Sequence, residues 1–486
     1  MDKFFKISER GSTIKTEIMA GLTTFFAMAY IVLVNPNQVA GEGSNGWLAG
    51  AVPDMAGELG TVWNAVFIAS ILVAIVGTLL MAFLADMPFA QACGMGLNSF
   101  FCTIFVAGAA FAGVSVIRGY QAGLVIVLIS GLVFLILSVT GLRKYIAVAM
   151  PECLKKSIPA GIGLFIALIG LKNATLIQDN PYTFVQFFDF HGVITSAGST
   201  KEAIAQIAPP IVAFVGFIII AILAKLNVKG NIIIGILAST VLYYVMMLQA
   251  PNFDFSSIGQ SFKDFGSVGF LGVFQGQAWK DAFSAEYIGG VFSAIMLVVS
   301  FCLVDMFDTI GTLVGTASRA GMVDENGEMP NMKQALISDA VATVVGSATG
   351  TSTVTTFVES ASGVEAGGRT GLTALVTGIL FLACMFIAPI AAIIPPAATS
   401  AALIYVGILM ISGLKKINFD DMTQTVPVAL MLISMPISGS IGHGIGLGLI
   451  AYTVIKLFTG KAKEVSVLTY IISIIFLIKF FLVVSV

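Results

Sequence analysis

The chain has 486 residues, of which 57% are hydrophobic and only 10% carry a charged side chain. Soluble domains have charged residues at about 25% of their positions, so this composition excludes an ordinary soluble enzyme. The net charge of −2 offers no basic surface for a nucleic acid, and we expect no nucleic-acid partner. We therefore expect a membrane protein whose chain crosses the lipid bilayer many times.

Apolar segments follow one another along nearly the whole chain, many of them close to the roughly 20 residues that a helix needs to cross a bilayer. The first half contains the predicted spans 17–36, 63–84, 88–108, 120–140, 157–173, 207–226 and 231–248. The second half contains 288–316, 334–349, 352–364, 370–394, 397–413, 422–437 and 440–458. A further apolar helix at 466–484 either crosses the bilayer or lies along its cytoplasmic face, and both interpretations stay open.

The positions of the basic residues predict the orientation of the chain. With the N-terminal segment 1–16 in the cytoplasm, most of the 24 Lys and Arg residues fall in cytoplasmic segments, as the positive-inside rule requires. The basic residues that fall on the other side are Arg118, Lys172, Lys201, Lys263 and Lys280. We expect a cytoplasmic N-terminus.

A polar extracytoplasmic connection at 249–287 divides the spans into two halves. Each half has an odd number of spans, so the halves have opposite orientation, as in an inverted repeat. The third span of each half is interrupted, in the first by Gly94 and Gly96 and in the second by a Thr-, Ser- and Val-rich run at 351–358 that favours extended backbone. We expect these runs to pair as short antiparallel strands, each followed by a half-helix that begins near Gly94 or Glu359. Broken spans at matching positions indicate a transporter's binding site.

Acidic residues inside predicted spans are the main candidates for function, because ionisable groups in the bilayer are costly. Asp305 and Asp308 share one helical face, which Thr312 extends by one turn. Glu359 begins a half-helix, where its simplest role is a helix cap. We expect Asp308 and Glu359 to bind substrate or a proton, although hydrogen bonding between helices is the alternative for the aspartates. Asn98 suits a planar heteroaromatic ligand or, equally, a hydrogen bond between helices.

Signatures of enzymes and cofactors are missing from the sequence. There is no HExxH, GxSxG or Walker motif, and the five cysteines show no spacing typical of a metal site or a disulfide framework. We expect no enzyme activity, no metal and no cofactor. Without a nucleotide-binding loop, transport would be driven by an ion gradient. Asp339, Asn35 and His443 are interpreted mainly as structural residues.

Four segments carry a resemblance to a known family: GLTTFFAMAYIVLVNP, GMGLNSFF, CLVDMFDTIGTLVG and TSTVTTFVESASGVEAGGRTGLTAL. In sequence and order they resemble the AzgA-like adenine/guanine/hypoxanthine permeases, the purine-permease branch of the nucleobase–cation symporter family. The resemblance extends over essentially the whole chain. It implies an all-α polytopic fold of fourteen transmembrane segments in two inverted repeats of seven. The core domain would comprise 17–140 and 288–394, and the gate domain 157–248 and 397–458.

The resemblance also implies a mechanism and a set of site residues. A purine nucleobase would bind between core and gate, and the core would move against the gate to give alternating access with proton symport across the cytoplasmic (inner) membrane. The family's substrate-binding acids fall on Asp308 and Glu359, either of which could take up the proton, and its polar third-span residue falls on Asn98. Uracil-type members have a histidine in place of Thr312, which fits the purine branch. Asp305 and Phe357 complete the predicted substrate contacts, with Phe26 and Tyr30 as further stacking candidates.

Two other functions remain open at this stage. The first is an anion transporter or channel on the same seven-plus-seven fold, which would bind its anion at the half-helix N-termini and would not need two acids. The second is a transporter specific for uracil or xanthine, whose hydrogen-bonding edges resemble those of the other bases. An intramembrane aspartyl protease would need a GxGD-like element, which is missing. A homodimer stays open as the assembly.

Overall fold

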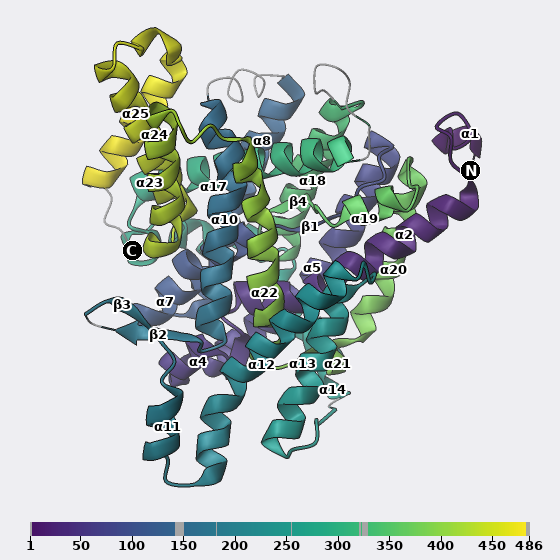
Figure 1. Cartoon of the computed structure of the whole chain (residues 1–486), viewed down its shortest axis with the longest axis vertical. Coiled ribbons are helices and arrows are strands. Elements are labelled where there is room, and N and C mark those ends of the chain that lie inside the picture. The colour runs from purple at the N-terminus through teal and green to yellow at the C-terminus, as the bar shows by residue number, and fades with distance from the viewer. Residues whose placement is uncertain are drawn as a thin grey trace.

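The computed structural model describes residues 2–140, 150–180, 182–253, 255–319, 322 and 329–482, which are mostly helical (Figure 1). Within these residues, seven helices are long and apolar enough to cross a membrane: Ile14–Val39, Pro53–Ala85, Val116–Thr140, Glu152–Asn173, Thr200–Lys225, Val291–Leu313 and Ile441–Phe458. Shorter apolar helices lie between and after them: Met95–Phe111, Asn231–Met247, Gly371–Phe386, Pro396–Met410, Met422–Ser438 and Val467–Ile478.

The helices of the first half follow the predicted spans closely. They are α2 (Ile14–Met28), α3 (Ile31–Val39), α5 (Ala56–Leu80), α8 (Val116–Thr140), α10 (Glu152–Asn173), α12 (Thr200–Lys225) and α13 (Asn231–Met247). Those of the second half are α17 (Val291–Arg319), α18 (Met332–Thr349), α20 (Gly371–Ala383), α22 (Pro396–Met410), α23 (Met422–Ser438), α24 (Ile441–Phe458) and α25 (Val467–Leu482).

Polar side chains at several helix starts explain where those helices begin. Thr13, Ser199, Thr370, Asp421 and Ser440 each occupy the position before a helix, and each side chain accepts a hydrogen bond from a backbone N–H of the first turn. Such a cap satisfies one of the N–H groups that the helix itself leaves without a partner.

Both interrupted spans contain a short strand followed by a short helix, as predicted. The first holds β1 (Gln91–Cys93) and α6 (Met95–Phe101), and the second holds β4 (Val354–Thr356) and α19 (Ser360–Glu365). The two strands pair antiparallel, which confirms the expectation that the broken spans pair with each other. The register places Gln91 opposite Thr356, Ala92 opposite Thr355 and Cys93 opposite Val354.

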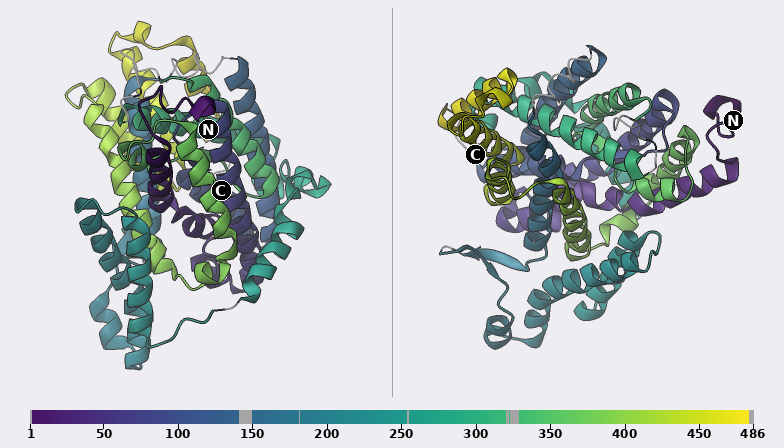
Figure 2. Two further views of the ribbon diagram at one scale, coloured as in Figure 1. Left: turned by 90° about the vertical axis from the view of Figure 1, so that its right-hand side faces the viewer. Right: turned by 45° about the horizontal axis from the view of Figure 1, so that its top comes forward.

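The helices pack in two groups. Helices α10, α12, α13, α22, α23 and α24 contact one another and form what we name the α10 group. Helices α2, α3, α5, α8, α17, α18, α19 and α20 form the second, the α5 group. The groups meet where α10 and α24 contact α17, where α13 contacts α2 and where α22 contacts α3, and α10 also contacts α6. Figure 2 shows the α12–α13 pair, in teal, and the α24–α25 pair, in yellow, at separate edges of the molecule.

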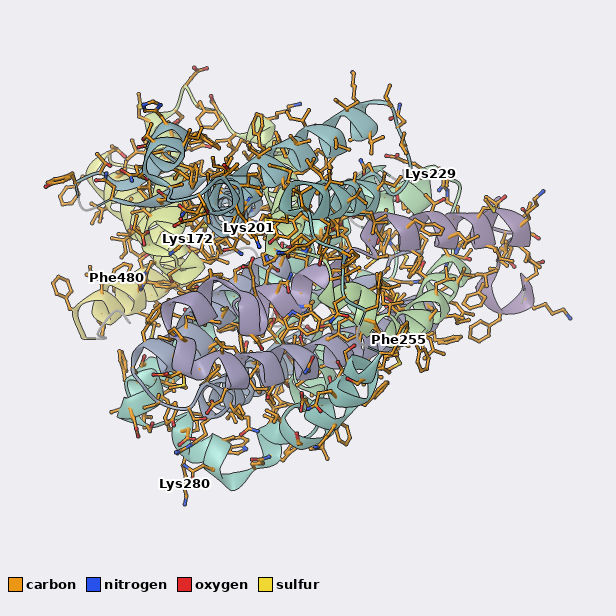
Figure 3. All side chains as sticks on the ribbon, turned by 90° about the horizontal axis from the view of Figure 1, so that it is seen from below. Lys172, Lys201, Lys229, Phe255, Lys280 and Phe480 are labelled. Atoms are coloured by element: carbon orange, nitrogen blue, oxygen red, sulfur yellow. The ribbon has the colours of Figure 1, made fainter. Side chains whose placement is uncertain are left out.

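The long polar connections contain more structure than the sequence predicted. The connection at 174–206 holds an antiparallel hairpin of β2 (Ile177–Asn180) and β3 (Phe184–Phe187), followed by α11 (Phe190–Ser196). The connection at 249–287 holds α14 (Ser256–Asp264), α15 (Gly276–Asp281) and α16 (Ala285–Ile288), and it packs on α5 and α8. Figure 3 shows Lys201 and Lys280 of these connections, and Lys172 at the end of α10, from below.

The last helix, α25, packs against α24. The hydroxyl oxygens of Thr453 and Ser473 lie 2.8 Å apart, and Ser473 also donates to the carbonyl of Leu449 at 3.3 Å. Near the start of α24, a Cβ added to Gly446 would lie 2.6 Å from the ring of Phe476. The order of these contacts makes the pair antiparallel. Residues 483–484 of the predicted segment lie outside the described residues.

Candidate functional site

The paired strands place the starts of the two half-helices at opposite ends of one short ladder. Gly94 follows β1 and precedes α6, and its N–H donates to the carbonyl of Thr353 at 3.0 Å. At the other end, the N–H of Phe357 donates to the carbonyl of Ala90 at 3.0 Å, and α19 begins directly after Glu359. Extended backbone at membrane depth needs such partners for its polar groups.

Glu359 stands at the start of α19 but does not cap it. Its backbone is helical (φ −61°, ψ −20°), and its side chain makes no capping hydrogen bond. One carboxylate oxygen, Oε1, instead accepts a hydrogen bond from the hydroxyl of Tyr30 at 2.6 Å. The side chain is partly exposed and forms no ion pair with any described residue. A capping role therefore does not account for this carboxylate.

Asp308 lies on α17, which contacts α19, so the two acids belong to neighbouring elements. The side chain is 9% exposed, and its Oδ1 has no hydrogen-bond partner among the described residues. A buried carboxylate oxygen without a partner is unfavourable unless a ligand or a proton satisfies it. Thr312, one turn further, is equally buried and donates back to the carbonyls of Asp308 and Thr309 at 3.0 and 3.1 Å.

Asp305 is linked to strand β4 through the hydroxyl of Thr343. Its Oδ2 accepts from the hydroxyl of Thr343 at 3.2 Å, and the same hydroxyl accepts from the N–H of Val354 at 3.0 Å. Asp339 has a similar position beside β1, where it accepts from Gln91 at 3.2 Å and from Thr309 at 2.5 Å. Both aspartates therefore help to hold the strand pair against α17 and α18.

Asn98 belongs to a buried polar network that joins three elements. Its amide N–H₂ donates to Asn35 on α3, and its Oδ1 accepts from the hydroxyl of Ser352 just before β4. Asn35 in turn donates to Ser70 on α5 and, at 3.4 Å, to Thr351. The structure thus contains the helix-to-helix bonding that was one of the two expectations for Asn98. These bonds use one of its two amide protons.

The aromatic candidates differ in their surroundings. Phe357 is 4% exposed and belongs to the hydrophobic core. Phe26 is half exposed and packs edge-on against Phe25, with ring centroids 5.5 Å apart. Tyr30 is fully buried, so its ring has no free face for stacking, and its polar end contacts Glu359. The sequence did not predict this hydrogen bond, although a tyrosine hydroxyl in an apolar span requires a partner.

The comparison with known proteins begins with the family. The profile of the Permease family matches residues 15–445. The chain belongs to this family. The permease is 36% identical over 479 residues to the adenine permease AdeP of Escherichia coli (strain K12), with 99% of this chain and 95% of the relative covered. It is 38% identical over 482 residues to the guanine/hypoxanthine permease PbuG of Bacillus subtilis (strain 168), with 99% of each covered.

Solved structures show the same fold at low sequence identity. The transmembrane domain of a cyanobacterium bicarbonate transporter, BicA, matches with a TM-score of 0.57 and 15% identity over 90% of the permease and 97% of that chain. The murine anion transporter Slc26a9 in its inward-facing state matches with a TM-score of 0.57 and 13% identity over 92% and 69%. These likenesses confirm the predicted seven-plus-seven fold. Membership of the family confirms that the permease is a membrane transport protein and not an enzyme.

Proposed function

We propose that the permease takes up purine nucleobases (adenine, guanine or hypoxanthine) by proton symport, with Glu359 and Asp308 as the principal substrate contacts. The observation that carries the proposal is that these two acids lie on neighbouring elements beside the β1–β4 strand pair. Asp308 has an oxygen without a hydrogen-bond partner among the described residues, and Glu359 accepts a hydrogen bond at one oxygen from Tyr30. The relatives named as adenine and guanine/hypoxanthine permeases support the substrate class.

The chemistry of the base provides a reason for proton coupling. The edge of a purine presents N–H donors next to ring nitrogens that accept hydrogen bonds. Two ionised carboxylates can only accept, whereas a protonated carboxyl group also donates. Protonation of one acid therefore gives the site one donor and one acceptor, which matches the base. Glu359 is the stronger candidate for the proton because it is the more exposed of the two acids.

Alternating access would come from movement of the core domain against the gate domain. We assign the α5 group to the core domain and the α10 group to the gate domain, and at two glycines, one in α17 of the α5 group and one in α6, the contacts with α10 are apolar. A Cβ added to Gly96 would overlap Ile162 of α10, and one added to Gly311 would lie 3.6 Å from Pro159. At these two glycines the contacting atoms are apolar, so sliding breaks no hydrogen bond between them. We propose that Asn98 and Thr312 belong to the core side of the site, because both make their hydrogen bonds to residues outside the α10 group.

The anion-transporter alternative has the fold in its favour. An anion bound beside the β1–β4 strand pair would be close to Asp308 and Glu359, and like charges at short range repel. The permease is accordingly proposed to carry neutral bases. We also propose that it lies in the cytoplasmic membrane with its N-terminus inside, on the strength of its basic residues.

The decisive test compares Glu359→Gln with Glu365→Gln in proteoliposomes. Glu365 is exposed at the end of the same half-helix and serves as the matched control. The wild type and Glu365→Gln should concentrate radiolabelled purine under an imposed proton gradient, and a protonophore should abolish accumulation. Glu359→Gln should lose accumulation. Normal accumulation by Glu359→Gln would show that the proton role is wrong. Competition by unlabelled uracil alone would show that the substrate is not a purine, and competition by xanthine alone would show that it is a purine other than the three proposed.

A further inference from the structure

The first span and half-helix α19 are in close contact along the whole length of α19. A Cβ added to Gly363 would overlap the hydroxyl of Thr24 and lie 2.8 Å from the carbonyl of Ala20, so α19 touches α2 without intervening side chains. Beyond the end of α19, the N–H of Arg369 donates to Glu17 at 2.9 Å. These contacts fix how α2 and α19 lie against each other.

Tyr30 extends this contact to the start of α19. It lies at the junction between α2 and α3, is fully buried, and has its hydroxyl 2.6 Å from Oε1 of Glu359 and 3.9 Å from the sulfur of Met95. A tyrosine has a single hydroxyl proton, and here that proton is donated to Oε1. Among the described residues, Tyr30 is the one side chain that donates to this carboxylate, and it donates to Oε1 and not to the second oxygen, Oε2.

We propose, resting on the proposed function, that Tyr30 is a positioning residue that holds Oε1 of Glu359 and leaves Oε2 for the base and the coupled proton. A carboxylate held at one oxygen has to break that hydrogen bond before its two oxygens can exchange by rotation. The direction of the remaining oxygen is therefore fixed by the first span. This role differs from stacking on the base, because the buried ring has no free face.

Few other titratable groups face Glu359. The helices packed against α19 are α2 and α17, and the segment before β1 also reaches it, where Ser360 accepts from the N–H of Ala90 at 3.0 Å. The guanidinium of Arg369 donates to the carbonyl of Val364 near the far end of α19. Besides Tyr30, the first span brings Glu17, which is hydrogen-bonded at the far end of α19 to the backbone of Arg369. Helix α17 brings Asp308 and Asp305, and the latter is bonded to Thr343. The effect of Tyr30 on Glu359 can therefore be measured against a small number of neighbours.

The test compares Tyr30→Phe with Tyr120→Phe in the full-length permease. Tyr120 is also fully buried, and its hydroxyl donates to the carbonyl of Gly350, away from Glu359. Tyr30→Phe should raise the KM for radiolabelled purine roughly tenfold, since a hydrogen bond to a charged group is lost, with kcat changed far less. Its uptake profile should also move by about one unit towards higher pH, because loss of the donor favours the protonated carboxyl group. Tyr120→Phe should change protein yield and thermal stability but neither KM nor the profile.

A second pair of measurements keeps the inference open to refutation if Tyr30→Phe is poorly folded. Glu359→Asp retains the carboxylate but withdraws it from Tyr30, and should show the same shift in KM and pH profile. In equilibrium counterflow, which needs no proton gradient, Tyr30→Phe should add nothing to the KM of Glu359→Ala, because that variant has already lost the oxygen that accepts from Tyr30.

The outcomes separate the two proposals. If the wild type concentrates none of the bases adenine, guanine and hypoxanthine under a proton gradient, the proposed function is overturned and this inference with it. If the wild type does so but Tyr30→Phe behaves like Tyr120→Phe, only the inference about Tyr30 is overturned. Additive effects of Tyr30→Phe and Glu359→Ala on KM would overturn it too.

Discussion

Glu42 predicts a specific dependence of stability on pH. It lies in the turn between α3 and α4 (Trp47–Ala51), is 8% exposed, and has a left-handed backbone with φ 71°. Burial raises the pKa of its carboxyl group from 4.5 to about 8, against the opposing effect of hydrogen bonds from the backbone of Trp47 and the side chain of Asn173. Asn173 belongs to α10, so the carboxyl group joins the α5 group to the α10 group.

The sign and size of the effect follow from proton linkage. Between pH 4.5 and pH 8 the folded protein keeps a proton on Glu42 that the unfolded chain has released, so stability falls as the pH rises. The difference of about 3.5 between the two pKa values corresponds to about 5 kcal/mol, which is lost progressively up to pH 8 and changes no further above it. Glu42→Gln removes the titration while it keeps an oxygen that accepts from Trp47.

Thermal unfolding of the detergent-solubilised protein between pH 5 and pH 9 measures the effect. The difference in midpoint between Glu42→Gln and the wild type should grow with pH up to about pH 8 and then level off, with the variant the more stable. Glu286→Gln, an exposed glutamate at the start of α16, should match the wild type at every pH. The reasoning is refuted if the difference between Glu42→Gln and the wild type is the same at all pH values.

Three further predictions concern packing. Gly363→Ala should push α19 off α2 and lower purine uptake more than tenfold, at a stability cost of about 1–3 kcal/mol; unchanged uptake would contradict the close contact. Cysteines at positions 453 and 473 (Thr453→Cys with Ser473→Cys) should form a disulfide under mild oxidation, detected by mass spectrometry, and its absence would contradict the packing of α25 on α24. Arg118→Ala should lower the unfolding midpoint by an amount equivalent to about 1 kcal/mol, because Asp281 on α15 loses two hydrogen bonds of 2.9 and 2.8 Å from the guanidinium. A midpoint equal to the wild type would show that the pair does not anchor the connection at 249–287.

The sequence predicted the broken spans because their composition is unusual for a membrane helix. The Thr-rich run before Glu359 and the glycines before Asn98 both favour departure from helix, and their matching positions in the two halves indicated that they would meet. The register of β1 on β4 needed the structure, since three residue pairs leave little periodicity to compare.

Contacts between distant segments could not be predicted from the sequence. Tyr30 and Glu359 are 329 positions apart, and nothing in either neighbourhood specifies the other. The network of Asn98 depends in the same way on Asn35 and Ser352, which come from separate spans. The hairpin at 177–187 was missed because its exposed, mixed-polarity strands have no apolar face that would reveal a period of two.

The pairing of β1 with β4 has a consequence for biosynthesis. Gln91 and Thr356 are 265 positions apart, so a ribosome adding about 5–20 residues per second completes β4 roughly 10–50 s after β1. Until then, the extended backbone of β1 has no strand partner, and each unpaired N–H or C=O group costs several kcal/mol in hydrocarbon. The third span must therefore stay sheltered by water or by the insertion machinery during this interval. The ladder that underlies the transport site is completed only when the second half of the chain has entered the membrane.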